Sequence, residues 1–190
     1  MNNQTNMNNI TKITSINQAI ELSNTIKQNY DIILFLDIDD TVLSPYIGKK
    51  FVEDEICQLV DLIYSIEPNN LIFLTARDHD LKSYTKNQLN KSGLLHKGKY
   101  IDYNIICSPY DDNGNSTKGQ SLTTCIESKY LFGVEKNENN QQSKKNWIMF
   151  IDDQYEHIES ANKELEKLNG KLIDKINYVL MHYQCDLTIH

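Results

Sequence analysis

Residues 33–42, with the sequence Ile-Leu-Phe-Leu-Asp-Ile-Asp-Asp-Thr-Val, constrain the fold of this chain more than any other segment. An apolar run ends abruptly at Asp37, and a second carboxylate follows at Asp39. Strands of parallel sheets form near-continuous apolar runs because helices cover both faces, and ligands bind beyond their carboxyl ends. The segment therefore predicts a buried parallel strand whose acidic end lies where α/β proteins carry out chemistry.

Asp37, Asp39 and Asp40 form a close group of acids in a chain that is already acidic, with a formal net charge of −7. Carboxylates this close repel one another and raise each other's pKa unless a cation or a proton lies between them. The group predicts a site for a divalent metal ion.

Length and charge exclude several classes of protein. A chain of 190 residues, 39% of them hydrophobic, suits one domain with its own core. The negative charge and the lack of a basic stripe argue against general binding to nucleic acids or to anionic membranes. The four cysteines are scattered, so we expect reduced thiols and no zinc or redox site.

The sequence also predicts a cytoplasmic location. The first residues contain neither a basic leader nor an apolar core segment, so they do not form a signal peptide. No stretch approaches the ~18 consecutive apolar residues that a membrane-spanning helix needs.

The pattern of an apolar run that ends in polar residues recurs along the chain, and helical periodicities separate the runs. Further strands are predicted at residues 71–75, 103–108, 147–152 and 176–183, and helices at residues 15–26, 52–66, 79–91, from 118 onward, and from 158 to a stop at Gly170. The alternation predicts an α/β domain with a parallel sheet of about five strands.

Two polar segments are expected to lie outside the packed domain. Residues 1–12 are rich in asparagine and are predicted to form a disordered tail, so that the domain covers residues 13–190. Residues 134–146 form a low-complexity insertion, which is predicted to be a mobile surface loop.

Four ends of predicted strands or helices carry polar side chains of different types. In chain order these are the pair Asp37 and Asp39, then Thr75, then Lys118, and finally the pair Asp152 and Asp153. Because parallel strands present their carboxyl ends at one edge of a sheet, we expect these residues to meet in one pocket.

The order and setting of these residues resemble the four motifs of the haloacid dehalogenase (HAD) superfamily of aspartyl phosphotransferases. Residues 37–41 resemble the first motif, Thr75 the second, Lys118 the third, and Asp152 with Asp153 the fourth. The resemblance covers about residues 31–183, and the spelling of the motifs is most similar to a bacterial HAD-like subfamily of unknown function.

The resemblance implies a Rossmann-like HAD fold and a phosphatase that forms an aspartyl-phosphate intermediate. Asp37 would attack phosphorus, and Asp39 would protonate the leaving oxygen and later activate water. Thr75 would donate its hydroxyl to the phosphoryl group, and Lys118 would add positive charge. The segments between the motifs are too short for a large cap domain, so we expect an open site. Such a site indicates either a large or macromolecular phosphorylated substrate or closure by an oligomer partner or by the loops at residues 44–50 and 108–117.

A magnesium ion is the expected cofactor. Asp37, the backbone carbonyl of Asp39, and one or both of Asp152 and Asp153 would hold Mg²⁺, since oxygen ligands suit this hard ion.

The roles of several other residues stay open. Arg77 and His79 follow Thr75 closely and either contact the substrate or are structural. The remaining histidines lack partners at ligand spacing and are expected to be ordinary surface or core residues: His96, His157, His182 and His190.

Three other functions compete with hydrolysis. A catalytically silent HAD-like binding or scaffold protein would keep the same residues, and so would a phosphotransferase that passes the phosphoryl group to an acceptor other than water. A receiver domain also uses Asp, Thr, Lys and an acidic pair, but its acidic pair precedes the phosphorylated Asp. The order in this chain argues against a receiver domain.

Overall fold

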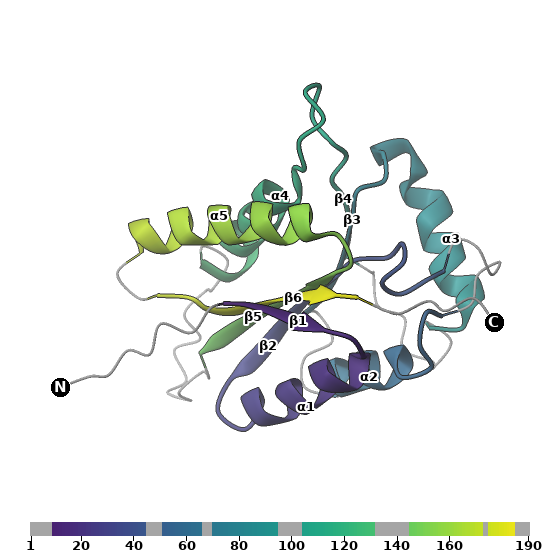
Figure 1. The fold of residues 1–190 in the computed structure, drawn as a ribbon, viewed down its shortest axis with the longest axis horizontal. Helices are drawn as coiled ribbons and strands as arrows, with labels where there is room; N and C mark the ends of the chain where they lie inside the picture. The colour runs from purple at the N-terminus through teal and green to yellow at the C-terminus, as the bar shows by residue number, and fades with distance from the viewer. Residues whose placement is uncertain are drawn as a thin grey trace.

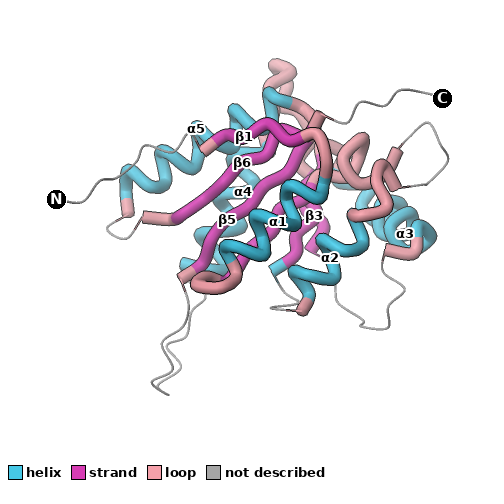
Figure 2. The backbone as a smooth tube through the Cα atoms, turned by 60° about the horizontal axis from the view of Figure 1, so that its bottom comes forward, coloured by secondary structure: helices cyan, strands magenta, loops and turns pink. Residues whose placement is uncertain are grey.

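The structure is a computed structural model that describes residues 9–44, 51–65, 70–94, 104–131, 145–172 and 175–184. Its centre is one sheet of six parallel strands in the order β1-β6-β5-β2-β3-β4, with helices on both faces (Figures 1 and 2). The predicted α/β fold with a parallel sheet is confirmed, and the sheet has one strand more than expected. Within the described ranges no separate cap domain lies between the strands.

The strands are β1 (Ile10–Ile13), β2 (Asp31–Leu36), β3 (Leu71–Thr75), β4 (Asn104–Cys107), β5 (Asn146–Asp152) and β6 (Asn177–Tyr183). The helices are α1 (Ile16–Ile26), α2 (Ile56–Tyr64), α3 (Lys82–Ser92), α4 (Lys118–Ile126) and α5 (Tyr155–Lys171). A 3₁₀ helix, His79–Leu81, leads into α3, and a π-helical turn, Glu127–Leu131, extends α4. None of the helices in the described part of the chain is long and apolar enough to cross a membrane.

Strand β2 shows why the opening apolar run has no polar interruptions. Leu34 and Leu36 belong to the core cluster under α1 and α2, whereas Ile33 and Phe35 belong to the cluster under α4 and α5. In Figure 1 the two helix pairs lie on opposite sides of the sheet. Every second side chain therefore enters a different core, and both sets must be apolar.

Strand β1 corrects the predicted boundary of the N-terminal tail. Residues 10–12 were expected to be disordered, but they pair in parallel with β6, from Ile10 with Leu180 to Ile13 with Tyr183. The strand is short, and two of its four side chains are exposed, so its sequence carries no apolar run. Residues 1–8 lie outside the described part of the chain.

Two further boundaries differ from the prediction. Helix α2 begins at Ile56, later than expected; the N–H of Val52 donates to the Val42 carbonyl (3.0 Å), and a turn at residues 54 and 55 leads into the helix. Helix α5 continues to Lys171 and does not stop at Gly170. Of the predicted insertion, residues 134–144 lie outside the described ranges, and its last residue begins β5.

The order of the strands places the acidic ends together. From β2 the chain proceeds through β3 and β4 on one side, then returns to β5 and β6 on the other, so the order reverses between β2 and β5. Ligands of α/β proteins bind at such a switch point. Leu36 is in register with Ile151, and the N–H of Asp37 donates to the Ile151 carbonyl (3.0 Å). Asp37 and Asp152 therefore leave adjacent strands side by side.

Candidate functional site

Three carboxylates converge at the switch point. Asp37, Asp152 and Asp153 each offer one oxygen, and these oxygens all lie within 4.8 Å of one another. The Nζ of Lys118 lies 2.5 Å from Oδ1 of Asp37 and 2.6 Å from Oδ2 of Asp152. Lys118 is 1% exposed, so one buried ammonium group bridges the acids that end β2 and β5.

Burial and the neighbouring charges shift the pKa values of the groups in this cluster. Burial raises the pKa of Asp37 to about 8, with further increases from Asp152 and Asp153, although Lys118 opposes them. Burial, followed by repulsion from Asp152 and Asp40, raises the pKa of Asp153 to about 6. Burial would lower the pKa of Lys118, but the two acids raise it above its usual value. Three carboxylates face one ammonium group, so the cluster carries excess negative charge when its acids are ionised, and its carboxylate oxygens could hold a metal ion.

The approach of α4 to α5 positions Lys118, the first residue of α4. The N–H of Gly119 donates to Oγ of Ser160 in α5 (3.3 Å). A Cβ atom at Gly119 would lie 2.3 Å from the Ser160 carbonyl oxygen, so only glycine allows this approach. The close packing brings the start of α4 to the end of β5, where Asp152 lies.

A tight turn after β2 supports Asp153. Its Asp40 has a φ of 58°, a left-handed conformation that aspartate tolerates better than most residues. The next residue, Thr41, donates its hydroxyl to Oδ1 of Asp153 (3.3 Å) and accepts the Asp153 N–H (3.1 Å). This reciprocal pair links the first predicted motif to the fourth.

Asp39 lies in an ion pair with Arg77. The guanidinium donates from Nε to Oδ2 (2.8 Å) and from Nη2 to Oδ1 (2.5 Å), so both oxygens of Asp39 accept from it. The Nη1 of Arg77 donates to Oγ1 of Thr85 (3.0 Å) and Oε1 of Gln88 (2.5 Å), both in α3. Helix α3 therefore holds Arg77 against Asp39.

The two remaining predicted residues differ in position. Thr75 ends β3, is fully buried, and accepts the N–H of Arg77 at its hydroxyl oxygen (3.4 Å). His79 begins the 3₁₀ helix and is exposed. The structure joins Asp37, Lys118 and the acidic pair in one cluster and pairs Asp39 with Arg77, but no interaction among the described residues links His79 to the acids.

His157 was expected to be an ordinary surface or core residue, and it is buried. The sequence did not predict its contacts: its Nδ1 lies 3.0 Å from Oδ1 of Asp152, and its Nε2 lies 2.9 Å from the hydroxyl of Tyr110. The Nε2 of His182 also contacts the site, 3.0 Å from the Asp153 carbonyl oxygen. The position of His157 in the first turn of the helix after the acidic pair was the available signal.

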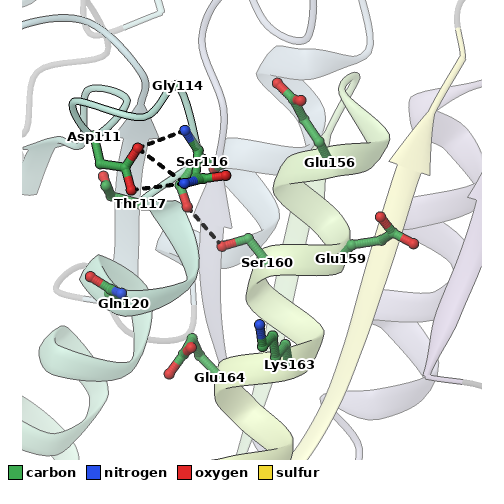
Figure 3. A pocket seen from close by; sticks show the side chains of 11 residues that line it. Asp111, Gly114, Ser116, Thr117, Gln120, Glu156, Glu159, Ser160, Lys163 and Glu164 are labelled. Atoms are coloured by element: carbon green, nitrogen blue, oxygen red, sulfur yellow. Dashed lines mark hydrogen bonds between the residues drawn. The ribbon is translucent and has the colours of Figure 1, made fainter.

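A groove of about 570 Å³ lies between the loop before α4 and the first turns of α5 (Figure 3). Its lining includes the acids Asp111, Glu156, Glu159 and Glu164, with Lys163 among them. The acids of the cluster do not contribute to it. This acidic lining is unsuited to a phosphate group, so the groove is distinct from the candidate site.

Comparisons with family models, with curated proteins and with solved structures gave no match. The resemblance to the HAD superfamily therefore stays a prediction from the motifs.

Proposed function

We propose that the protein is a Mg²⁺-dependent phosphatase that hydrolyses a phosphomonoester through an aspartyl-phosphate intermediate. The observation that carries this proposal is the buried cluster in which Lys118 bridges Asp37 and Asp152 while Asp153 offers a third carboxylate oxygen. Phosphoryl transfer depends mainly on positioning and on stabilising charge, and this cluster supplies a nucleophile, a cation and a set of oxygen ligands.

Asp37 is the proposed nucleophile. Lys118 contacts its Oδ1, so Oδ2 is the oxygen that would attack phosphorus while the bond to the leaving oxygen breaks. The ammonium would keep the carboxylate in a fixed direction and offset the charge of the phosphoryl oxygens. The hydroxyl of Thr75, at the end of the adjacent strand, would donate to one of those oxygens.

Asp39 is the proposed acid and base. It would give a proton to the leaving oxygen, then take one from the water that breaks the bond between phosphorus and Asp37. Its pairing with Arg77 occupies both carboxylate oxygens in the free protein. A phosphorylated substrate would offer Arg77 another anionic partner, so substrate binding would release Asp39 for proton transfer.

The acidic cluster is the proposed Mg²⁺ site, with Asp37, Asp153, Asp152 and the backbone carbonyl of Asp39 as candidate ligands. When bound, the ion would lower the repulsion between the nucleophile and the phosphate dianion. Three carboxylates beside one ammonium group, with oxygen atoms within 4.8 Å of one another, support this assignment.

Hydrolysis of p-nitrophenyl phosphate by the purified chain tests the proposal. We expect activity that requires Mg²⁺, disappears with EDTA and falls at least ~1,000-fold in Asp37→Asn, since the substitution removes the nucleophile. Asp31→Asn is the matched control, because Asp31 begins the same strand at the opposite edge of the sheet.

Two results would contradict the proposal. Full activity of Asp37→Asn would exclude the aspartyl-phosphate route. A lack of hydrolysis across a panel of phosphomonoesters, by a folded protein that binds Mg²⁺, would favour a catalytically silent binding protein.

A further inference from the structure

His157 is a buried side chain that the proposed reaction does not use. It lies in the first turn of α5 and is 1% exposed. Both of its ring nitrogens have partners: Nδ1 faces the Asp152 carboxylate at 3.0 and 3.1 Å, and Nε2 faces the Tyr110 hydroxyl at 2.9 Å. Because a carboxylate only accepts, Nδ1 is the donor in the first contact.

The donors around Asp152 determine how its carboxylate is oriented. Lys118 donates to Oδ2 (2.6 Å), the N–H of Gln154 donates to Oδ1 (2.9 Å), and His157 donates between the two oxygens. A carboxylate has about four lone-pair positions. Three donors therefore hold Asp152 in one orientation and leave room for one further partner, such as a cation.

Tyr110 fixes His157 from the other side. Its ring lies 5.6 Å from the His157 ring, between centroids, and its hydroxyl also lies 2.6 Å from Oε1 of Glu156 and 2.9 Å from Oε1 of Gln154. The loop after β4 and the first turn of α5 thus clamp the imidazole. A continuous chain of polar contacts runs from Tyr110 through His157, Asp152 and Lys118 to Asp37.

We propose that His157 is a positioning residue of the metal site, which turns Asp152 so that Oδ2 faces Lys118 and the remaining lone pair faces the acidic cluster. Tyr110 supports His157 through the contact between its hydroxyl and the Nε2 atom of His157. The inference rests on the proposed Mg²⁺ site, and it assigns a function to two residues outside the four motifs. Partners that orient metal ligands in this way typically change metal affinity by roughly 10- to 100-fold.

The test is Mn²⁺ and Mg²⁺ binding by titration calorimetry, without substrate, on the full chain and on three variants of His157. Leu removes both contacts, Asn keeps an amide donor near the position of Nδ1, and Gln places its amide near the position of Nε2. We expect His157→Leu and His157→Gln to weaken binding by about 10-fold or more. His157→Asn should stay within about threefold of the wild type, because it can still donate to Asp152.

Tyr110→Phe is the second variant, since it removes one partly exposed hydroxyl and leaves the ring in place. We expect it to weaken metal binding in the same direction as His157→Leu, but less. Unfolding temperatures of all variants show whether each one is folded at the temperature of the titration.

The order of affinities decides the inference. Equal affinities for the folded Leu, Gln and Asn variants, or affinities equal to that of the wild type, would overturn it, because His157 would then be only a packing residue. A wild type that binds neither ion would overturn both the inference and the proposed metal site. The expected order in a protein without phosphatase activity would uphold the positioning role and overturn the proposed reaction.

Discussion

The two adjacent acids at the end of β5 have different surroundings. Asp152 is fully buried and accepts from Lys118, His157 and the N–H of Gln154. Asp153 is partly exposed, and its carboxylate accepts from Thr41. The same substitution should therefore have opposite effects on folding at the two positions.

Asp152→Asn should destabilise the fold strongly. The substitution leaves the buried Lys118 ammonium with one carboxylate partner in place of two. It also places an amide N–H group, itself a donor, against the donors that surround Asp152. Breaking a buried ion pair in this way costs about 3–5 kcal/mol of unfolding free energy, measurable by urea denaturation. An Asp152→Asn variant as stable as the Asp31→Asn control would show that Lys118 does not depend on this pair.

Asp153→Asn should stabilise the metal-free protein at neutral pH. The pKa of Asp153 is raised from 3.8 to about 6 in the folded state, mainly by burial, so its ionisation opposes folding. Stability is therefore lost as pH rises from about 4 to 6, and the loss persists above this range. In EDTA the variant should unfold at a higher temperature than the wild type at pH 7.5, and the two temperatures should converge near pH 4.

One result would contradict the prediction for Asp153→Asn. An advantage that is equally large at pH 4 and pH 7.5 would mean that the carboxylate charge is not the cause.

The residue types of the candidate site could be predicted from the sequence, because each follows an apolar run or begins a helix. The ion-pair and hydrogen-bond partners of these residues could not be predicted. Asp39 follows β2 and Arg77 follows β3, and nothing in either local sequence indicates that the two side chains form an ion pair. His157 was missed for a similar reason, since its contact with Asp152 depends on how α5 leaves the sheet.

At the scale of elements, helices α4 and α5 pack closely against each other. They do so at Gly119, where the Ser160 carbonyl occupies the space of a Cβ atom. Backbone cannot move aside as a flexible side chain can, so an added methyl group must separate the helices.

Gly119→Ala should destabilise the fold by about 1–3 kcal/mol, the usual cost of overpacking. Gly170→Ala in α5 is the matched control, because nothing lies within 4 Å of its added Cβ. Alanine in place of helical glycine should there stabilise the fold by roughly 0.5–1 kcal/mol. Urea denaturation measures both changes, and a loss of stability in both variants would argue against the specific contact at Gly119.

Long apolar runs and helix caps were predictable at the scale of elements, whereas short or tertiary-dependent features were not. Ser15 with Gln18 three residues later has the sequence pattern of a capping box, and both of its hydrogen bonds are present at the start of α1; Gly93 ends α3 with a φ of +85°. Strand β1 exists because β6 provides an edge for it. The segment before α2 contacts the turn after β2, where the Val52 N–H donates to the Val42 carbonyl, and no local pattern reveals this contact.

At the scale of the whole molecule, the acidic cluster lies at the centre of the sheet, because the switch point is between β2 and β5. Each of these strands pairs on both sides, and their ends hold Asp37 and Asp152. A cation bound there should therefore stabilise the entire domain.

Mg²⁺ should raise the unfolding temperature of the full chain. At a concentration 100 times the dissociation constant, binding adds about 2.7 kcal/mol, which corresponds to roughly 5–10 °C for a domain of this size. Differential scanning calorimetry measures the shift. Asp37→Asn should lose most of it and Asp31→Asn should keep it; an equal shift in both variants would indicate non-specific binding.

The chain has a single tryptophan, Trp147, which serves as an intrinsic fluorescence probe. It lies at the start of β5, edge-to-face with Tyr30 (centroids 5.1 Å apart, planes at 71°). Asp152 ends the same strand, about 17 Å away at ~3.3 Å per residue. Tryptophan emission should therefore change when the domain unfolds and stay constant when a small ion binds at the candidate site, which lies at the opposite edge of the sheet.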